Sequence, residues 1–118
     1  MTITATHVLS ATTLIGDEIK NTSGQALGKL EDIMLDLDGG SIRYAVMASG
    51  GFLGIGDHFF AVPWSALRVD TKDHCVILDI SPEKLKGAPG FDKDNWPDFA
   101  DPAFGKTIYA YYGQPMYW

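Results

Sequence analysis

A hairpin near the middle of the sequence constrains the fold more than any other feature. Residues 32–38, DIMLDLD, alternate between apolar and carboxylate side chains, with Met34 on the carboxylate side. Side chains alternate between the two faces of a strand, so we expect a half-buried strand with its carboxylates in water. The buried face would carry Ile33, Leu35 and Leu37. Asp38-Gly39-Gly40 tolerates the positive φ of a tight turn, and a strand over 41–48 follows.

Short strands separated by turn residues continue from about residue 14 to residue 80. Leu14-Ile15-Gly16 opens the first expected strand, and the later ones cover 58–62, 66–69 and 74–80. Ser10 and Ser81 stand where each would cap a helical turn. The predicted fold class is mainly β, a small and mostly antiparallel barrel with short helical turns over residues 1–86.

Residues 87–118 form an aromatic-rich C-terminal extension, which contains nine of the fourteen aromatic residues of the chain. Disordered segments carry few aromatic residues, so we expect this extension to pack on its own barrel or on a partner subunit. Asp101, Pro102 and Gly113 have the positions of a helix cap, a first helical residue and a stop. The helix between them would place Phe104, Ile108 and Tyr111 on one face.

Four features of residues 8–86 together resemble the PRC-barrel family. They are Leu14-Ile15-Gly16, Gly24 followed by Leu27-Gly28-Lys29-Leu30, Arg43-Tyr44-Ala45-Val46, and Phe60-Ala61-Val62-Pro63-Trp64. The family is named from the cytoplasmic domain of the photosynthetic reaction-centre H subunit and includes the C-terminal domain of the ribosome maturation factor RimM. The extension resembles that of small stand-alone bacterial members. The resemblance implies a compact β-barrel that serves as a protein interaction or assembly module, and it carries over no catalytic residue.

Composition narrows the classes of partner. The chain of 118 residues has a net charge of −6, and clustered Lys and Arg, which nucleic-acid binding needs, are missing. No stretch approaches the length of a membrane span and the first residues do not form a signal peptide, so we expect no membrane insertion. The single cysteine, Cys75, fits the reducing cytoplasm.

Motifs for cofactor or metal chemistry are weak, and we expect none of these ligands. The glycines of residues 50–56 precede a strand, whereas a phosphate loop leads into a helix, so they indicate a wide hairpin. The three histidines are scattered, and Asp92, Asp94 and Asn95 form an acidic turn that lacks the calcium-loop glycine. His74 and Cys75 would point to opposite faces of a strand, with His74 on the core side.

We therefore expect a non-enzymatic interaction module that binds protein, most simply a second copy of itself. The candidate partner surface consists of the large apolar residues of the 50–56 hairpin and three from the extension: Phe52, Leu53, Ile55, Trp96, Phe104 and Tyr111. The alternative is a small-molecule-binding or catalytic pocket between barrel and extension. Its lining would be Trp96, Tyr109, Tyr111 and the Asp57-His58 pair.

Overall fold

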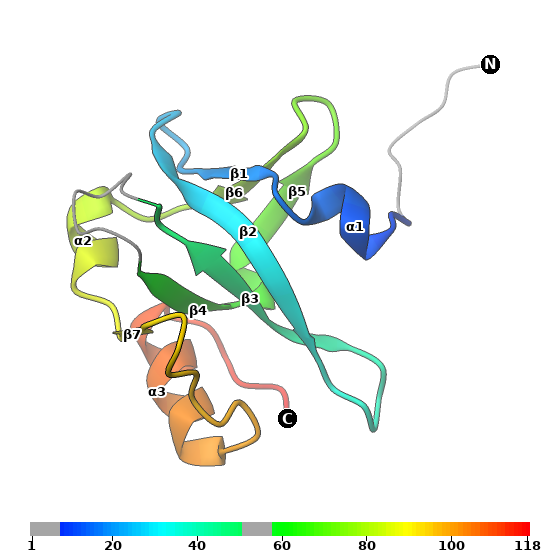
Figure 1. Ribbon diagram of the computed structural model, residues 1–118, viewed down its shortest axis with the longest axis vertical. Helices are drawn as coiled ribbons and strands as arrows, with labels where there is room; N and C mark the ends of the chain where they lie inside the picture. Colours follow the sequence, from blue (N-terminus) through cyan, green and yellow to red (C-terminus); the bar gives the residue numbers. More distant parts are fainter. Residues whose placement is uncertain (1–7, 51–57) are drawn as a thin grey trace.

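The computed structural model describes residues 8–50 and 58–118, and its ribbon is shown in Figure 1. One seven-stranded sheet dominates this part of the chain, in the order β5-β6-β1-β2-β3-β4-β7. The strands are β1 (Glu18–Lys20), β2 (Ala26–Leu35), β3 (Ile42–Ala48), β4 (Phe59–Pro63), β5 (Leu67–Asp70), β6 (Cys75–Leu78) and β7 (Gly90–Phe91). The helices are α1 (Ala11–Leu14), the 3-10 turn η1 (Trp64–Ala66), α2 (Pro82–Lys86) and α3 (Pro102–Tyr111).

The prediction of a mainly β fold is confirmed, but that of a closed, antiparallel barrel is only partly right. Among the described strands five pairings are antiparallel, and β1 pairs with β6 in parallel. The sheet curls without closing, so that β5 and β7 remain its two edges. Part of the outer edge of β4 is occupied by β7, and β4 ends at Pro63, which has no N–H to donate. After Pro63 the turn η1 redirects the chain into β5, which pairs with β6 instead.

Aliphatic side chains fill the inner, concave face of the curled sheet. This main core cluster takes residues from β1, β2, β3, β4 and β6, and from the ends of α1 and α2. Its largest fully buried members include Ile19, Leu27, Leu30, Met47 and Phe60. Ser10 caps α1 and Ser81 caps α2 through their side-chain oxygens, as predicted, so both short helices begin where the sequence indicated.

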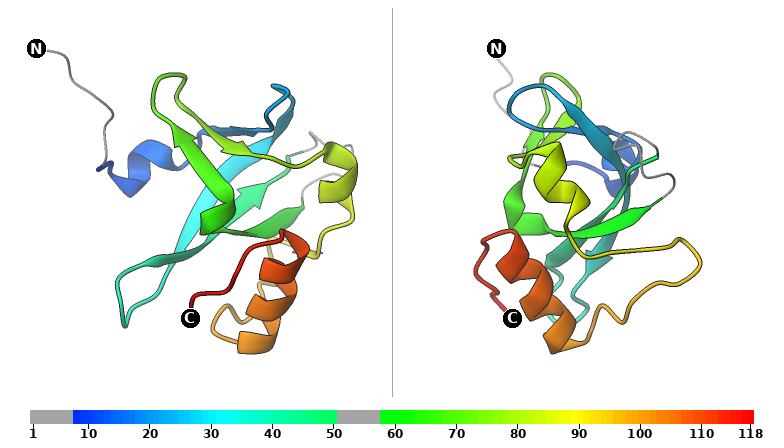
Figure 2. Two further views of the ribbon diagram at one scale, coloured as in Figure 1. Left: turned by 180° about the vertical axis from the view of Figure 1, so that it is seen from behind. Right: turned by 90° about the vertical axis from the view of Figure 1, so that its left-hand side faces the viewer.

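The C-terminal extension covers the opposite face of β3 and β4 (Figures 1 and 2). Tyr44 and Ala61 from the sheet form a second cluster with Ile108 and Tyr109 from α3. Partly buried residues complete it: Met34, Phe91, Phe99, Phe104, Tyr112, Met116 and Trp118. The central strands β3 and β4 are thus buried on both faces.

Helix α3 is capped by Asp101 with Pro102 in its first turn, as predicted. Its interior Gly105 has a packing reason, since a Cβ there would lie 2.9 Å from the Tyr44 hydroxyl and would also overlap the Trp118 ring. A glycine inside a helix ordinarily lowers its stability. Here the absence of a side chain allows the sheet, α3 and the C-terminal residue to approach one another closely.

The predicted faces of residues 32–38 are partly wrong. Ile33 packs against the main core cluster, but Leu35 is 59% exposed and Leu37 is 91% exposed. Strand β2 ends at Leu35, and its register against β3 shifts between Leu30 and Asp32 and again between Met34 and Leu35. The second shift breaks the two-residue period within the segment, and Leu37 lies beyond the end of the strand, in the turn.

Two further local predictions are corrected. Leu14 ends α1 and Gly16 adopts φ +94°, so residues 14–16 form a bend and the first strand begins at Glu18. His74 adopts φ +54° in the turn before β6 and is exposed, whereas Cys75 is buried. The strand begins one residue later than expected, which reverses the assignment of the two side chains.

Candidate functional site

The open side of the curled sheet carries several exposed apolar residues that lie close together. Three adjoining hollows of about 350, 200 and 150 Å³ lie between α1, β5 and the paired ends of β2 and β3. We call this region the seam surface and define it by six residues: Leu9, Ile15, Leu35, Ile42, Trp64 and Val69. Its floor is Leu14, which lines all three hollows.

The local sequence explains why the seam surface stays open. Helix α1 has only four residues and buries one of them, Leu14, so it covers little of the sheet. The residues on either side of it remain in water: Val8 is 86%, Leu9 38% and Ile15 37% exposed. Leu35 adds a further exposed side chain from the end of β2. Contiguous exposed apolar residues of this kind commonly mark a binding surface.

The charges around the seam surface are carboxylates. Asp17, Asp32 and Asp70 line its hollows, and neither Lys nor Arg is among the described lining residues. Asp70 accepts hydrogen bonds from the backbone N–H groups of Lys72 and Asp73, and these bonds lower the pKa of its carboxyl. The group therefore carries its negative charge at neutral pH.

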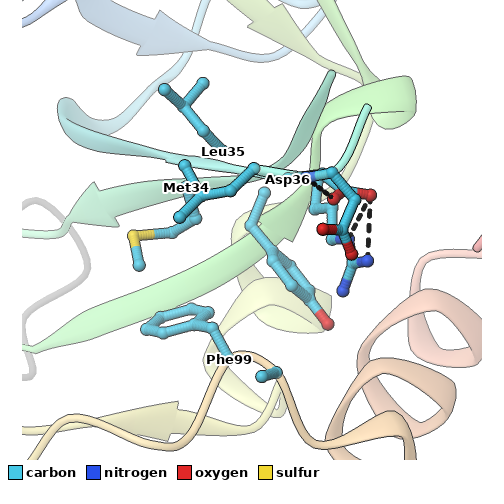
Figure 3. Close-up of a pocket in the computed structure, with 9 residues that line it drawn as sticks. Met34, Leu35, Asp36 and Phe99 are labelled. Atoms are coloured by element: carbon cyan, nitrogen blue, oxygen red, sulfur yellow. Dashed lines mark hydrogen bonds and ion pairs between the residues drawn. The ribbon is translucent and has the colours of Figure 1, made fainter. Parts of the chain in front are cut away.

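A separate hollow of about 310 Å³ lies between the β2–β3 hairpin and the extension (Figure 3). Met34 and the Tyr44 ring border it on the sheet side, and Phe99 borders it from the extension. At its rim the Arg43 guanidinium contacts the Asp36 carboxylate at 2.9 Å, and this hydrogen bond lowers the pKa of Asp36. The charges of Arg43 and Asp36 are thereby paired, and Asp38 is a further carboxylate that lines the hollow.

The predicted partner-surface residues from the extension lie in different places. Trp96 is 38% exposed and its ring contacts Phe59, so it lies beside the start of β4. Phe104 packs against Tyr44 within the second cluster, and Tyr111 packs against the main core cluster. Phe52, Leu53 and Ile55 lie outside the described residues. Trp96 is therefore the member of this set whose exposure and position suit contact with a partner.

The residues of the predicted small-molecule pocket do not line one common cavity. The Tyr109 hydroxyl donates to the Arg43 carbonyl of β3, whereas the Tyr111 hydroxyl donates to the Lys84 carbonyl of α2, so the two rings fill different spaces. His58 lies 3.9 Å from the Asp92 carboxylate, and Asp57 lies outside the described residues. The hollow that does lie between sheet and extension is lined by other residues, as described above.

Cys75 and the metal-ligating residue types were the remaining candidates for chemistry among the described residues. Burial raises the pKa of the Cys75 thiol, which keeps it in its unreactive protonated form. No three His, Cys, Asp or Glu residues within 8–50 and 58–118 gather where they could hold a metal ion. None of the helices in the same ranges is long and apolar enough to cross a membrane.

The sequence was compared with models of known protein families. A family model described as PRC-barrel domain matches residues 7–85, which cover the sheet from α1 to α2. The chain belongs to the PRC-barrel family. The match confirms the resemblance carried by the four sequence features, and it points to a general domain of protein interaction or assembly. No curated protein matches the sequence.

Sequence reasoning did not find the seam surface, although it noted several of its residues. Trp64, part of one of the family motifs, packs half-buried against the main core cluster and also lines the hollow of about 350 Å³. A signal was present in Leu9 and Ile15, two large apolar residues that flank a helical turn too short to bury them. Their convergence with Leu35 depends on the curl of the sheet.

Proposed function

We propose that this PRC-barrel protein is a non-enzymatic interaction module that binds protein rather than nucleic acid or membrane, and that it works in the cytoplasm. One observation carries the proposal: the seam surface leaves large apolar side chains in water directly above the main core cluster. Such surface is unfavourable unless a partner covers it. The net charge of −6 disfavours contact with phosphate backbones or anionic lipid.

Self-association is the second part of the proposal and involves a different face. Trp96 stands next to Phe59, and the 50–56 hairpin that carries Phe52, Leu53 and Ile55 ends just before this strand. A second copy that presents the same face would bury these apolar residues on both sides of a two-fold axis.

Light scattering of the full chain over a range of concentrations tests self-association. We expect a dimer that dissociates when Phe52, Leu53 and Ile55 are all replaced by Ser, while the control Leu37→Ser keeps the wild-type mass. Leu37 is a suitable control because it is 91% exposed on the β2–β3 turn. A chain that remains monomeric at high concentration would remove self-association from the proposal.

Affinity capture from the native cell tests the interaction module as a whole. The bait is the full chain, compared with the triple variant above and with a Leu9→Ser, Leu35→Ser double variant. A captured protein that is lost with one variant and retained with Leu37→Ser supports the function. The proposed function would be contradicted if all baits captured the same proteins and light scattering showed only a monomer.

A further inference from the structure

The seam surface is continuous with the main core cluster beneath it, unlike apolar residues that are exposed singly. Leu14 belongs to the main core cluster, and Trp64 and Val69 pack against that cluster from its margin. Leu9 and Leu14 line all three hollows, so the hollows adjoin one another around these two side chains. One continuous segment of a partner can therefore place successive apolar side chains in successive hollows, as amphipathic helices do in grooves.

Acidic residues at the rim of the seam surface favour a partner segment that is positively charged. Asp17 and Asp70 lie at the hollow beside the β5–β6 turn, and Asp32 lies at the hollow beside β2. Carboxylates thus stand at two of the three hollows, without a lysine or arginine among the described residues that line them. Cationic side chains that flank the apolar anchors would complement this arrangement.

We propose that the seam surface docks an amphipathic segment of another protein, with apolar anchors in the three hollows and Lys or Arg beside Asp17, Asp32 and Asp70. This inference rests on the proposed function and names the chemistry of the partner. A second copy of the chain is a poorer occupant of this site. A two-fold contact through the seam surface places two acidic rims against each other, and each copy carries a net charge of −6.

A pair of synthetic peptides tests the inference. Both peptides carry Leu at helical spacing, and the remaining positions are Lys in one and Glu in the other. Fluorescence anisotropy of the labelled peptides is measured against the full-length protein. We expect the Leu–Lys peptide to bind with a Kd of about 1–10 μM at low salt, and the Leu–Glu peptide to bind at least about tenfold more weakly.

Two variants separate docking at the seam surface from general attraction to an acidic protein. Leu9→Ser with Leu35→Ser removes apolar contacts and should weaken the Leu–Lys peptide about tenfold. Asp17→Asn with Asp32→Asn should weaken it about threefold at low salt and little at about 0.5 M salt, because salt screens exposed charges. The matched controls Leu37→Ser and Asp38→Asn lie on the β2–β3 turn outside the three hollows and should bind as the wild type does.

Four results would overturn the inference. They are binding of neither peptide, equal binding of both peptides, equal loss of binding in the Asp38→Asn control, and a dimer that dissociates on replacement of Leu9 and Leu35. The last result would assign the seam surface to a second copy. None of these results would contradict the proposed interaction function, because that function is tested separately by affinity capture with the variants and by light scattering.

Discussion

The extension and the N-terminal helix α1 both lie against the curled sheet, but they cover it to very different extents. The extension brings a ten-residue helix and a set of aromatic rings, and the sheet residues beneath it, Tyr44 and Ala61, are fully buried. Helix α1 brings four residues and one buried side chain, and its neighbours Val8 and Ile15 remain exposed. Two faces of similar apolar character therefore have different roles: one completes the fold, and the other is available to a partner.

The strongest test of this contrast removes the residue at the centre of the covered face. Tyr44 is fully buried and its ring contacts those of Phe99, Phe104, Tyr109 and Trp118. Tyr44→Ala should lower the free energy of unfolding by roughly 3–5 kcal/mol, as other buried aromatic deletions do. Urea unfolding measures the change, with the exposed Leu37→Ala as control. A loss below about 1 kcal/mol would mean that the extension contributes little to the fold.

Substitution at Gly105 tests how closely the extension approaches the sheet. Alanine in place of a helical glycine ordinarily stabilises by about 1 kcal/mol. Here the new methyl group would meet the Tyr44 hydroxyl and the Trp118 ring, so Gly105→Ala should instead destabilise by about 1–3 kcal/mol. Ala110→Gly, at an exposed position of the same helix, should cost only about 1 kcal/mol. A stabilised Gly105→Ala variant in thermal unfolding would show that the packing is loose.

A hydrogen bond across the same contact gives a smaller effect. The buried Tyr109 hydroxyl donates to the Arg43 carbonyl, and Tyr109→Phe leaves that carbonyl without this donor. We expect a loss of about 1 kcal/mol in chemical unfolding. The half-exposed Tyr117 hydroxyl donates to the Ile42 carbonyl, where water can replace it, so Tyr117→Phe should change stability less. Equal losses in the two variants would argue against a difference in burial.

The ion pair beside the extension predicts a pH dependence. The hydrogen bond from Arg43 lowers the pKa of Asp36 in the folded chain, so the unfolded chain binds this proton more readily. The resulting stability is present above the unfolded pKa, near 3.9, and is lost as the pH falls through the lower folded value. Asp36→Asn should therefore show a shallower loss of stability in acid, measured by urea unfolding from neutral to acid pH. Asp38→Asn controls for the loss of one negative charge from the same turn, and an equally shallow profile in that variant would contradict the assignment.

The smallest stability effect is expected on the open side of the molecule. Leu9 and Leu35 already contact water, so Leu9→Ser with Leu35→Ser should change the free energy of unfolding by no more than about 0.5 kcal/mol each. The same double variant should weaken the docking peptide strongly. A large loss of stability instead would mean that the residues of the seam surface stabilise the fold, as those beneath the extension do.

Local signals predicted the short-range elements well. The caps Ser10, Ser81 and Asp101, the Gly39-Gly40 turn and most strands lie where the sequence indicated, because each depends on neighbouring residues. The face of residues 32–38 was partly wrong because a register shift between Met34 and Leu35 interrupts the alternation and β2 ends at Leu35. The closure of the barrel was wrong because it depends on which edges of the sheet meet, and β7 occupies part of the edge of β4.

The sequence by itself determined the family, the β-rich fold and the presence of an aromatic extension that must pack on something. These follow from composition, from periodicity and from motifs contained within a few residues of one another. The tertiary structure alone decided that this extension covers the outer face of β3 and β4, and that Leu9, Ile15, Leu35, Ile42, Trp64 and Val69 meet along the open side. Those contacts join residues far apart in the chain, so they depend on how the sheet curls and not on any local pattern.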